Sequence, residues 1–255
     1  MNNRLKRLIS VVAGTCLLVV VALTACAESP EKGKTIPLKD AKLNIEHNAT
    51  DKDTGFQGFI DSEGWERIEF TGPEGVVLNF EGRGKLGILG LTELFFETVE
   101  PENKEVSIEE MLAKLPAGNY TIKGVSMENG DSKGETIGKA WLTHTIPEGP
   151  VLLSPKEDAK VSAEDLAVSW SPVTKSITGG MVTIIAYQLI IEKDEEPHPH
   201  MIGKRGLSMY LPASVTKIIV PKGFLEPGTS YKWEVLAIEE SGNQTLSSSG
   251  FKTRL

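Results

Sequence analysis

The stretch IEHNATDKDTGFQ places several oxygen-bearing side chains close together. Four candidate ligands fall within eight positions: Glu46, Asn48, Asp51 and Asp53. Ca²⁺ binds carboxylate, amide and carbonyl oxygens, and Gly55 would let the chain turn around an ion. The spacing is not that of an EF-hand, because Phe56 stands where that loop needs Gly. The stretch therefore predicts either a Ca²⁺ site or an Asx-rich turn that hydrogen-bonds to its own backbone.

Two histidines lie close together in DEEPHPH. On an extended segment His198 and His200 would share one face, so both imidazoles could reach one metal ion. The proline between them favours a loop instead. With Glu195 and Glu196 beside them, a solvated acidic loop is the alternative interpretation.

The stretch GRGKLG, from Gly82 to Gly87, matches G-x-G-x-x-G. That motif indicates a dinucleotide only between a strand and a helix of a βαβ unit. We expect a glycine-rich hairpin or bulge here. The chain contains no H-E-x-x-H, no G-x-S-x-G and no P-loop, and no context singles out a glycosidase pair among its carboxylates. We expect a protein that is not an enzyme.

Tryptophans are the candidate residues for carbohydrate contact. Trp65 lies among polar residues in SEGWERI, where it could stack on a sugar or cover the edge of a core. The other three are expected to point inward from strands: Trp141, Trp170 and Trp233.

The first residues, MNNRLKRLISVVAGTCLLVVVALTAC, are typical of a targeting segment. A positive head precedes an apolar run that is short for a membrane-spanning helix, which needs about 20 apolar residues. The ending Leu23-Thr24-Ala25-Cys26 resembles the lipobox of bacterial lipoproteins. The resemblance implies that Cys26 receives a diacylglyceryl group and becomes the acylated first residue. The alternative is an ordinary signal peptide that ends in a chance cysteine.

This resemblance implies how the chain is attached and where it is located. Residues 1–25 would be a signal peptide, and residues 26–40 the acylated cysteine and a flexible tether. Removing the signal takes away three positive charges and no negative one, so the formal charge goes from −8 to −11. Such a chain is a poor match for nucleic acid. We expect a membrane-anchored lipoprotein on the non-cytoplasmic side of a bacterial cell envelope, without disulfides.

Three N-x-S/T triplets begin at Asn48, Asn119 and Asn243. A bacterial lipoprotein signal argues against glycosylation, so these triplets are interpreted as chance.

Residues 41–147 are expected to form an N-terminal β-sandwich. VVLNFEG and TELFFETVE are rich in β-branched and aromatic residues, and YTIKGV and KAWLTHT alternate. One short inserted helix is expected in SIEEMLAKLP, where Ser107 and Glu110 have the spacing of a capping box. The prolines and glycine of IPEGP then predict an interdomain joint.

Residues 148–255 are expected to form a second β-sandwich, because short strand-like segments follow one another at even spacing. This part resembles a fibronectin type III domain in its early tryptophan and in the phrase LEPGTSYKWEV. The resemblance implies structural roles for Trp170, Leu225, Pro227, Gly228, Tyr231, Trp233 and Val235. The family's Arg-Gly-Asp tripeptide is absent, which argues against an integrin-type role.

A near echo of that phrase, LPAGNYTIKGV, runs from Leu115 to Val125. Each copy has a Pro and Gly turn before a strand whose early tyrosine can bond the upstream backbone. The echo predicts a related sandwich in the N-terminal half.

The expected fold class is therefore all-β, with two tandem β-sandwiches. The expected function is a non-catalytic binding, adhesion or spacer module that acts through protein–protein contacts. The alternative is a carbohydrate-binding accessory lipoprotein of a glycan-utilisation system, which a row of exposed Trp or Tyr would favour. No cofactor is expected, apart from the structural Ca²⁺ that the acidic stretch would bind.

Overall fold

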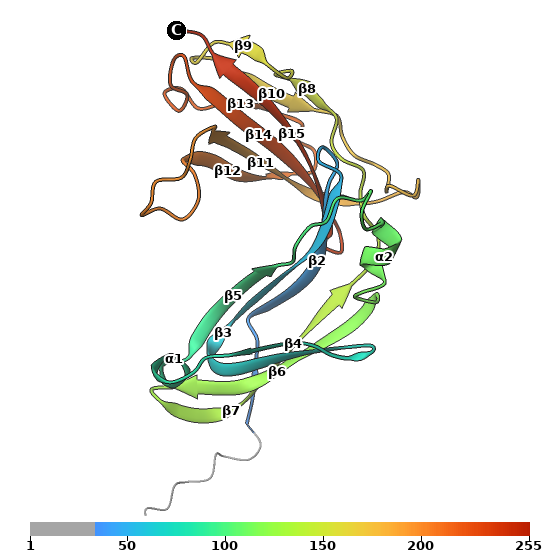
Figure 1. Ribbon diagram of the computed structural model, residues 1–255, viewed down its shortest axis with the longest axis vertical. Helices are drawn as coiled ribbons and strands as arrows, with labels where there is room; N and C mark the ends of the chain where they lie inside the picture. The colour runs from blue at the N-terminus through green and yellow to red at the C-terminus, as the bar shows by residue number, and fades with distance from the viewer. Residues whose placement is uncertain (1–33) are drawn as a thin grey trace, which may run out of the picture.

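The computed structural model describes residues 34–255, which are built mainly of β-strands (Figure 1). The predicted signal peptide and lipidation site at Cys26 lie outside the described residues. In the described part, no helix has both the length and the apolar character needed to cross a membrane. The predicted fold class, two tandem β-sandwiches, is confirmed.

Elements β1 to β7 form the N-terminal module. Its strands are β1 (Thr35–Pro37), β2 (Asp40–Asn48), β3 (Asp53–Gly72), β4 (Gly75–Glu81), β5 (Leu91–Glu97), β6 (Gly118–Glu128) and β7 (Asp131–Leu142). The long strand β3 belongs to both layers of this module. Its first part pairs with β2 and β5, and its second part pairs with β4 and β6. Register shifts on either side of Trp65 mark where β3 passes from one layer to the other.

The core of the N-terminal module lies between these layers. Its fully buried large side chains include Phe56, Ile60, Trp65, Phe70 and Tyr120. Trp65 is therefore a core residue and is not available to a sugar.

The module contains two short helices, α1 (Lys85–Leu89) and α2 (Ile108–Leu112). The predicted capping box of α2 is confirmed. The Ser107 hydroxyl accepts the N–H of Glu110 at 3.2 Å, and the Glu110 carboxylate accepts the N–H of Ser107 at 3.0 Å. Met111 anchors the helix in the core.

The prediction of a hairpin or bulge at GRGKLG is wrong. Residues 85–89 form the one-turn helix α1, which follows Gly84 at φ 57°. β4 and β5 both run antiparallel to β3, along different parts of it, so a tight hairpin cannot join them. The helix carries the chain between the layers, and the two strands are not the neighbouring parallel pair of a βαβ unit.

Elements β8 to β15 form the C-terminal module. Its strands are β8 (Leu152–Ser154), β9 (Ala159–Val161), β10 (Ala167–Trp170), β11 (Ile184–Lys193), β12 (Gly206–Pro212), β13 (Lys217–Ile219), β14 (Ser230–Glu239) and β15 (Gln244–Thr253). One layer has the order β13-β10-β8, and the facing layer has β15-β14-β11-β12. This arrangement of three antiparallel strands against four is that of a fibronectin type III domain.

The core of the C-terminal module contains the side chains that the resemblance singled out. Trp170, Leu225, Tyr231, Trp233 and Val235 are all buried in one cluster. Pro227 is exposed in the turn, and Gly228 has a φ of 65°, which favours glycine.

In each of the two phrases, the tyrosine that follows the turn bonds the upstream backbone. The Tyr231 hydroxyl accepts the N–H of Glu226 at 2.8 Å. The Tyr120 hydroxyl donates to the carbonyl of Pro116 at 2.7 Å. The two phrases therefore have the same structural role, because in each one the tyrosine hydroxyl fixes the turn to the strand that follows it.

The two modules share one β-sheet. Strand β2 of the N-terminal module pairs in parallel with β15 of the C-terminal module, with Glu46 opposite Gln244 and Asn48 opposite Leu246. This pairing joins the layers into a sheet of twelve strands. The blue start of the described chain and the C-terminus lie at opposite ends of the long axis (Figure 1).

Candidate functional site

Asn243 lies at the centre of the junction between the modules. It follows the turn between β14 and β15, and it is completely buried. Its side-chain oxygen accepts the N–H of Ile45 in β2 at 2.8 Å. Its amide nitrogen donates to the carbonyls of Thr143 at 3.1 Å and Thr145 at 2.8 Å, in the connection between modules. One side chain of the C-terminal module thus pairs with backbone groups of strand β2 and of the segment that joins β7 to β8.

A second contact completes this junction. The Thr245 hydroxyl donates to the carbonyl of Pro147 at 2.6 Å. In the sequence, Asn243 is distinguished only as the start of an N-x-S/T triplet. A Gly-Asn pair is ordinary in a turn, so its local sequence gives no sign of the contact with β2.

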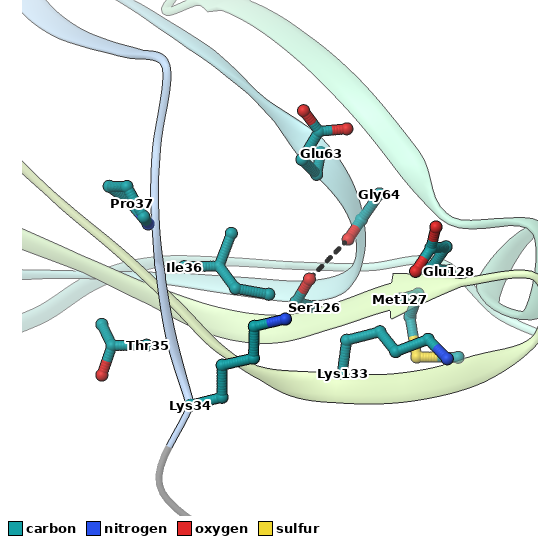
Figure 2. Close-up of a pocket in the computed structure, with 10 residues that line it drawn as sticks. All are labelled: Lys34, Thr35, Ile36, Pro37, Glu63, Gly64, Ser126, Met127, Glu128 and Lys133. Carbon is teal, nitrogen blue, oxygen red and sulfur yellow. Dashed lines mark hydrogen bonds between the residues drawn. The ribbon is translucent and has the colours of Figure 1, made fainter. Parts of the chain in front are cut away.

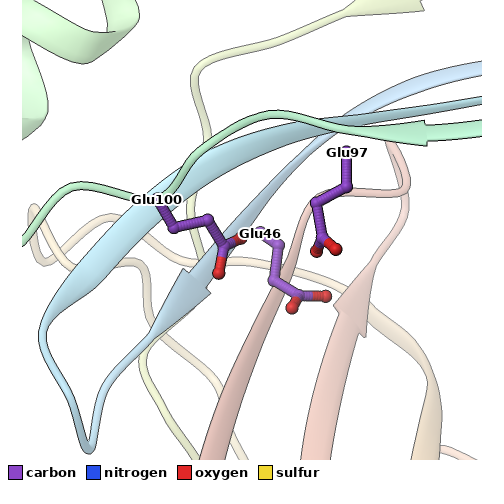
Figure 3. Close-up of side chains that lie close together, drawn as sticks. All are labelled: Glu46, Glu97 and Glu100. Carbon is purple, nitrogen blue, oxygen red and sulfur yellow. The ribbon is translucent and has the colours of Figure 1, made fainter. Parts of the chain in front are cut away.

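Three carboxylates converge beside the β2–β15 pairing. Glu46 on β2, Glu97 at the end of β5 and Glu100 just beyond it each offer one oxygen, and these oxygens lie within 4.8 Å of one another (Figure 3). We call this set the carboxylate cluster. Within residues 34–255 it is the only such group of three or more His, Cys, Asp or Glu side chains.

Neutral amides hold two of these carboxylates in place. Gln57 donates to Glu97 at 2.9 Å, and Gln244 of the C-terminal module donates to Glu46. Gln244 also donates to Gln57 at 3.1 Å. The three carboxylates belong to the N-terminal module, and an amide of the C-terminal module helps to hold them.

Burial disfavours ionisation of Glu46 and Glu100. Burial raises the pKa of Glu100 to about 7, and the nearby charges of Glu46, Glu97 and Asp53 add to this shift. Burial also raises the pKa of Glu46, although the hydrogen bond from Gln244 opposes the shift. The Oε1 atom of Glu100 is buried and has no hydrogen-bond partner within the described residues. A proton or a cation would relieve this crowding of negative charge.

The four residues of the predicted Ca²⁺ stretch do not all come together. The side-chain oxygen of Asn48 accepts the N–H groups of Thr50 and Asp51, each at 3.0 Å, and its amide donates to the Asp51 carboxylate at 2.9 Å. These bonds form an Asx turn between β2 and β3. Glu46 instead joins Glu97 and Glu100.

Asp53 begins β3, next to that turn. Its backbone pairs with Glu102, and burial raises its pKa, with the charge of Asp51 adding to the shift. Glu97 and Glu100 were not singled out from the sequence. The register of β5 on β3 brings them to Glu46, and a local stretch of sequence does not contain that register.

The two candidate metal-binding histidines lie in the loop between β11 and β12. Both are exposed, with ring centroids 5.6 Å apart, and Nδ1 of His198 accepts the N–H of His200 at 3.2 Å. Glu195 forms ion pairs with Arg205 and Lys193 and does not approach the imidazoles as a third ligand.

Exposed aromatic side chains are the candidates for a glycan surface. The expectation that Trp141 points inward is wrong, because 54% of this residue is exposed. Its neighbours Ala140 and Leu142 are buried, so strand alternation turns Trp141 outward on β7. Tyr210 is also exposed, but it lies on β12 in the other module. Among the described residues these aromatics do not form a row.

A cavity of about 390 Å³ lies beside strand β1 of the N-terminal module (Figure 2). Its wall includes Lys34 and Lys133 as well as Glu63 and Glu128. The hydroxyl of Ser126 donates to the carbonyl of Gly64 at 3.4 Å across it.

No family model matches the chain, and no curated protein matches it. Among solved structures, the FN1–FN3 domains of chicken CNTN1 are similar at 13% identity and a TM-score of 0.34, over 87% of this chain and 65% of that one. A two-domain fibronectin type III segment of chicken tenascin is similar at 15% identity and a TM-score of 0.30, over 84% and 98%. A redesigned β-sandwich protein matches at 16% identity and a TM-score of 0.29, over 42% and 93%.

The strand order defines the structural class of the protein. The chain is a tandem β-sandwich protein whose C-terminal module has the fibronectin type III arrangement of strands.

Proposed function

We propose that this protein is a lipoprotein of a bacterial cell envelope that acts as a non-catalytic binding, adhesion or spacer module. The observation that carries the proposal is the junction. The shared sheet and the buried contacts of Asn243 make the two modules a single elongated unit. Because the described chain starts at one end and finishes at the other, an anchor at Cys26 would hold the C-terminal module away from the membrane (Figure 1).

The lipid anchor is supported by the Leu-Thr-Ala-Cys ending and the apolar run before it. Incorporation of radiolabelled palmitate into the expressed protein tests it. We expect labelling of the natural chain and no labelling of Cys26→Ser. Labelling that persists in Cys26→Ser, or no labelling of either chain, would refute the anchor.

The proposed partner is another protein, met by the loops of the C-terminal module. The negative net charge disfavours nucleic acid. Cross-linking in intact membranes, followed by isolation of the lipidated protein, tests this role. We expect a discrete cross-linked protein that is lost with Cys26→Ser. Cross-links only to glycan would favour the second function.

The second candidate function is carbohydrate binding, and exposed Trp141 is the observation that favours it. A flat indole on an outward sheet face can stack on a sugar ring. Glycan binding that is abolished by Trp141→Ala and kept by Tyr210→Ala would establish this function. Equal binding by both variants would exclude Trp141 as the platform.

We also propose that the carboxylate cluster holds a structural Ca²⁺ ion. Glu46 is the residue that this proposal shares with the acidic stretch, and Glu97 and Glu100 supply further carboxylate oxygens. An ion there would link β2 to β5 beside the junction.

A further inference from the structure

An apolar groove opens along one side of the N-terminal module, between β4 and β5. Both strands pair with β3, but along different parts of it, so this side of the sandwich has no strand pairing to close it. Two cavities of about 280 Å³ and 490 Å³ share Val77, Thr98 and Leu115 in their walls. We call them together the β4–β5 groove.

The groove is lined with aromatic and aliphatic side chains. The ring of Phe96 meets those of Phe70 and Phe80, with centroids 5.8 Å and 5.9 Å apart. Phe80 and Phe96 are only partly buried, although they pack against the module core. Apolar surface is therefore left accessible inside the module, where another apolar group could cover it.

The groove offers few free polar groups. The Thr98 hydroxyl already accepts the N–H of Phe56 at 3.0 Å. Glu97 also lines the smaller cavity but not the larger one, and its carboxylate accepts a hydrogen bond from Gln57 at 2.9 Å. A sugar or a peptide needs several hydrogen-bond partners in its site, whereas an aliphatic chain needs none.

One positive charge lies at the α2 end of the groove. Lys114 lines the larger cavity, and within the described residues it forms no ion pair. An apolar groove with a cation at its end is complementary to a molecule with an aliphatic chain and an anionic head. The size of the groove falls in the range of sites for one small ligand.

We propose that the β4–β5 groove binds a monomeric long-chain carboxylate, with its chain against the phenylalanines and its carboxylate paired to Lys114. This ligand is separate from the protein partner proposed above. It would make the N-terminal module a carrier or sensor of free aliphatic acids.

Titration of the full-length protein with monomeric dodecanoate, followed by calorimetry, tests the proposal. We expect saturable binding of one dodecanoate per chain, weaker binding of dodecyltrimethylammonium and no binding of acetate. Absence of dodecanoate binding would overturn the proposal. Equal binding of both dodecyl compounds would overturn the assignment of Lys114.

Two pairs of variants locate the site. Val77→Trp fills the groove and should abolish binding, whereas Val76→Trp changes an exposed neighbour outside the lining and should not. Lys114→Glu should weaken dodecanoate binding by about fivefold or more, and Lys217→Glu, on the other module, should leave it unchanged.

Circular dichroism confirms that each variant is folded. Dodecanoate binding that is the same in Val77→Trp and Val76→Trp would show adsorption elsewhere and refute the groove as the site. Flotation with anionic phospholipid vesicles distinguishes a membrane as the occupant. If Lys114→Glu reduces vesicle binding and dodecanoate does not bind, the proposed ligand is wrong.

Discussion

Glu100 has a carboxyl group that is more easily protonated in the folded protein than in the unfolded chain. Its folded pKa is about 7, above the ordinary value of 4.5, and burial is the main cause. The folded state therefore binds more protons than the unfolded state between these two pH values. The stabilising contribution is fully present below about pH 4.5 and is lost as the pH rises through about 7.

Replacement of Glu100 by Gln tests this linkage. We expect Glu100→Gln to raise the melting temperature at pH 8 by about 2–4 °C, because one buried charge is removed from the cluster. At pH 5 the gain should be much smaller, since Glu100 is then protonated. Thermal unfolding from pH 5 to pH 8 measures both values. A gain that is the same at both pH values would contradict the assigned pKa.

Ca²⁺ should stabilise the same cluster above neutral pH. We expect millimolar Ca²⁺ to raise the melting temperature at pH 8 relative to EDTA, because binding to the folded state alone increases stability. Glu97→Gln should abolish the effect, and Asp51→Asn should keep it. If only Asp51→Asn abolishes the Ca²⁺ effect, the ion binds at the Asx turn between β2 and β3 and not at the carboxylate cluster. An unchanged melting temperature in the natural chain would rule out the ion.

The sequence indicates only part of this cluster. Glu46 is visible within a run of acidic and amide residues, and Asn48 and Asp51 form the local turn that was the alternative interpretation. Glu97 and Glu100 reach Glu46 through strand register, which depends on long-range packing. Asn243 of the C-terminal module contacts Ile45 of the N-terminal module. The sequence does not predict this contact either, because it also depends on long-range packing.

At the scale of elements, period-two alternation in YTIKGV predicts strand β6, and in KAWLTHT it predicts only the end of β7, where the face of Trp141 was assigned wrongly. The twenty-residue strand β3 was not predicted from the sequence. It contains glycines that normally interrupt a strand. Gly58 is needed there, because a Cβ atom would come within 2.2 Å of the Phe96 ring. Helix α1 was not predicted, because its own residues do not show that the chain crosses between layers there.

The tyrosine at the start of β14 gives an element-scale prediction. Tyr231→Phe removes the hydroxyl that accepts the N–H of Glu226 and keeps the ring in the core. We expect a loss of about 1 kcal/mol in the free energy of unfolding, measured by urea denaturation. Tyr210→Phe, on an exposed residue, is the control. A loss no larger than that of the control would show that the corner bond adds no stability.

At the scale of the whole molecule, the junction decides whether the protein is one body or two. Asn243→Ala would leave the buried N–H of Ile45, and the less buried carbonyls of Thr143 and Thr145, without this partner. Each unsatisfied buried group costs about 1–3 kcal/mol, so we expect a loss of about 2 kcal/mol or more by urea denaturation. Exposed Asn119→Ala is the matched control. Equal stability of the two variants would mean that the junction is not held by Asn243.

A spacer requires that the two modules move together as a single rigid unit. Backbone ¹⁵N relaxation measures the rotational correlation time of each module separately. We expect one common correlation time for the strands of both modules in the natural chain, and separate, shorter values in Asn243→Ala. Two different correlation times in the natural chain would contradict the proposed spacer role.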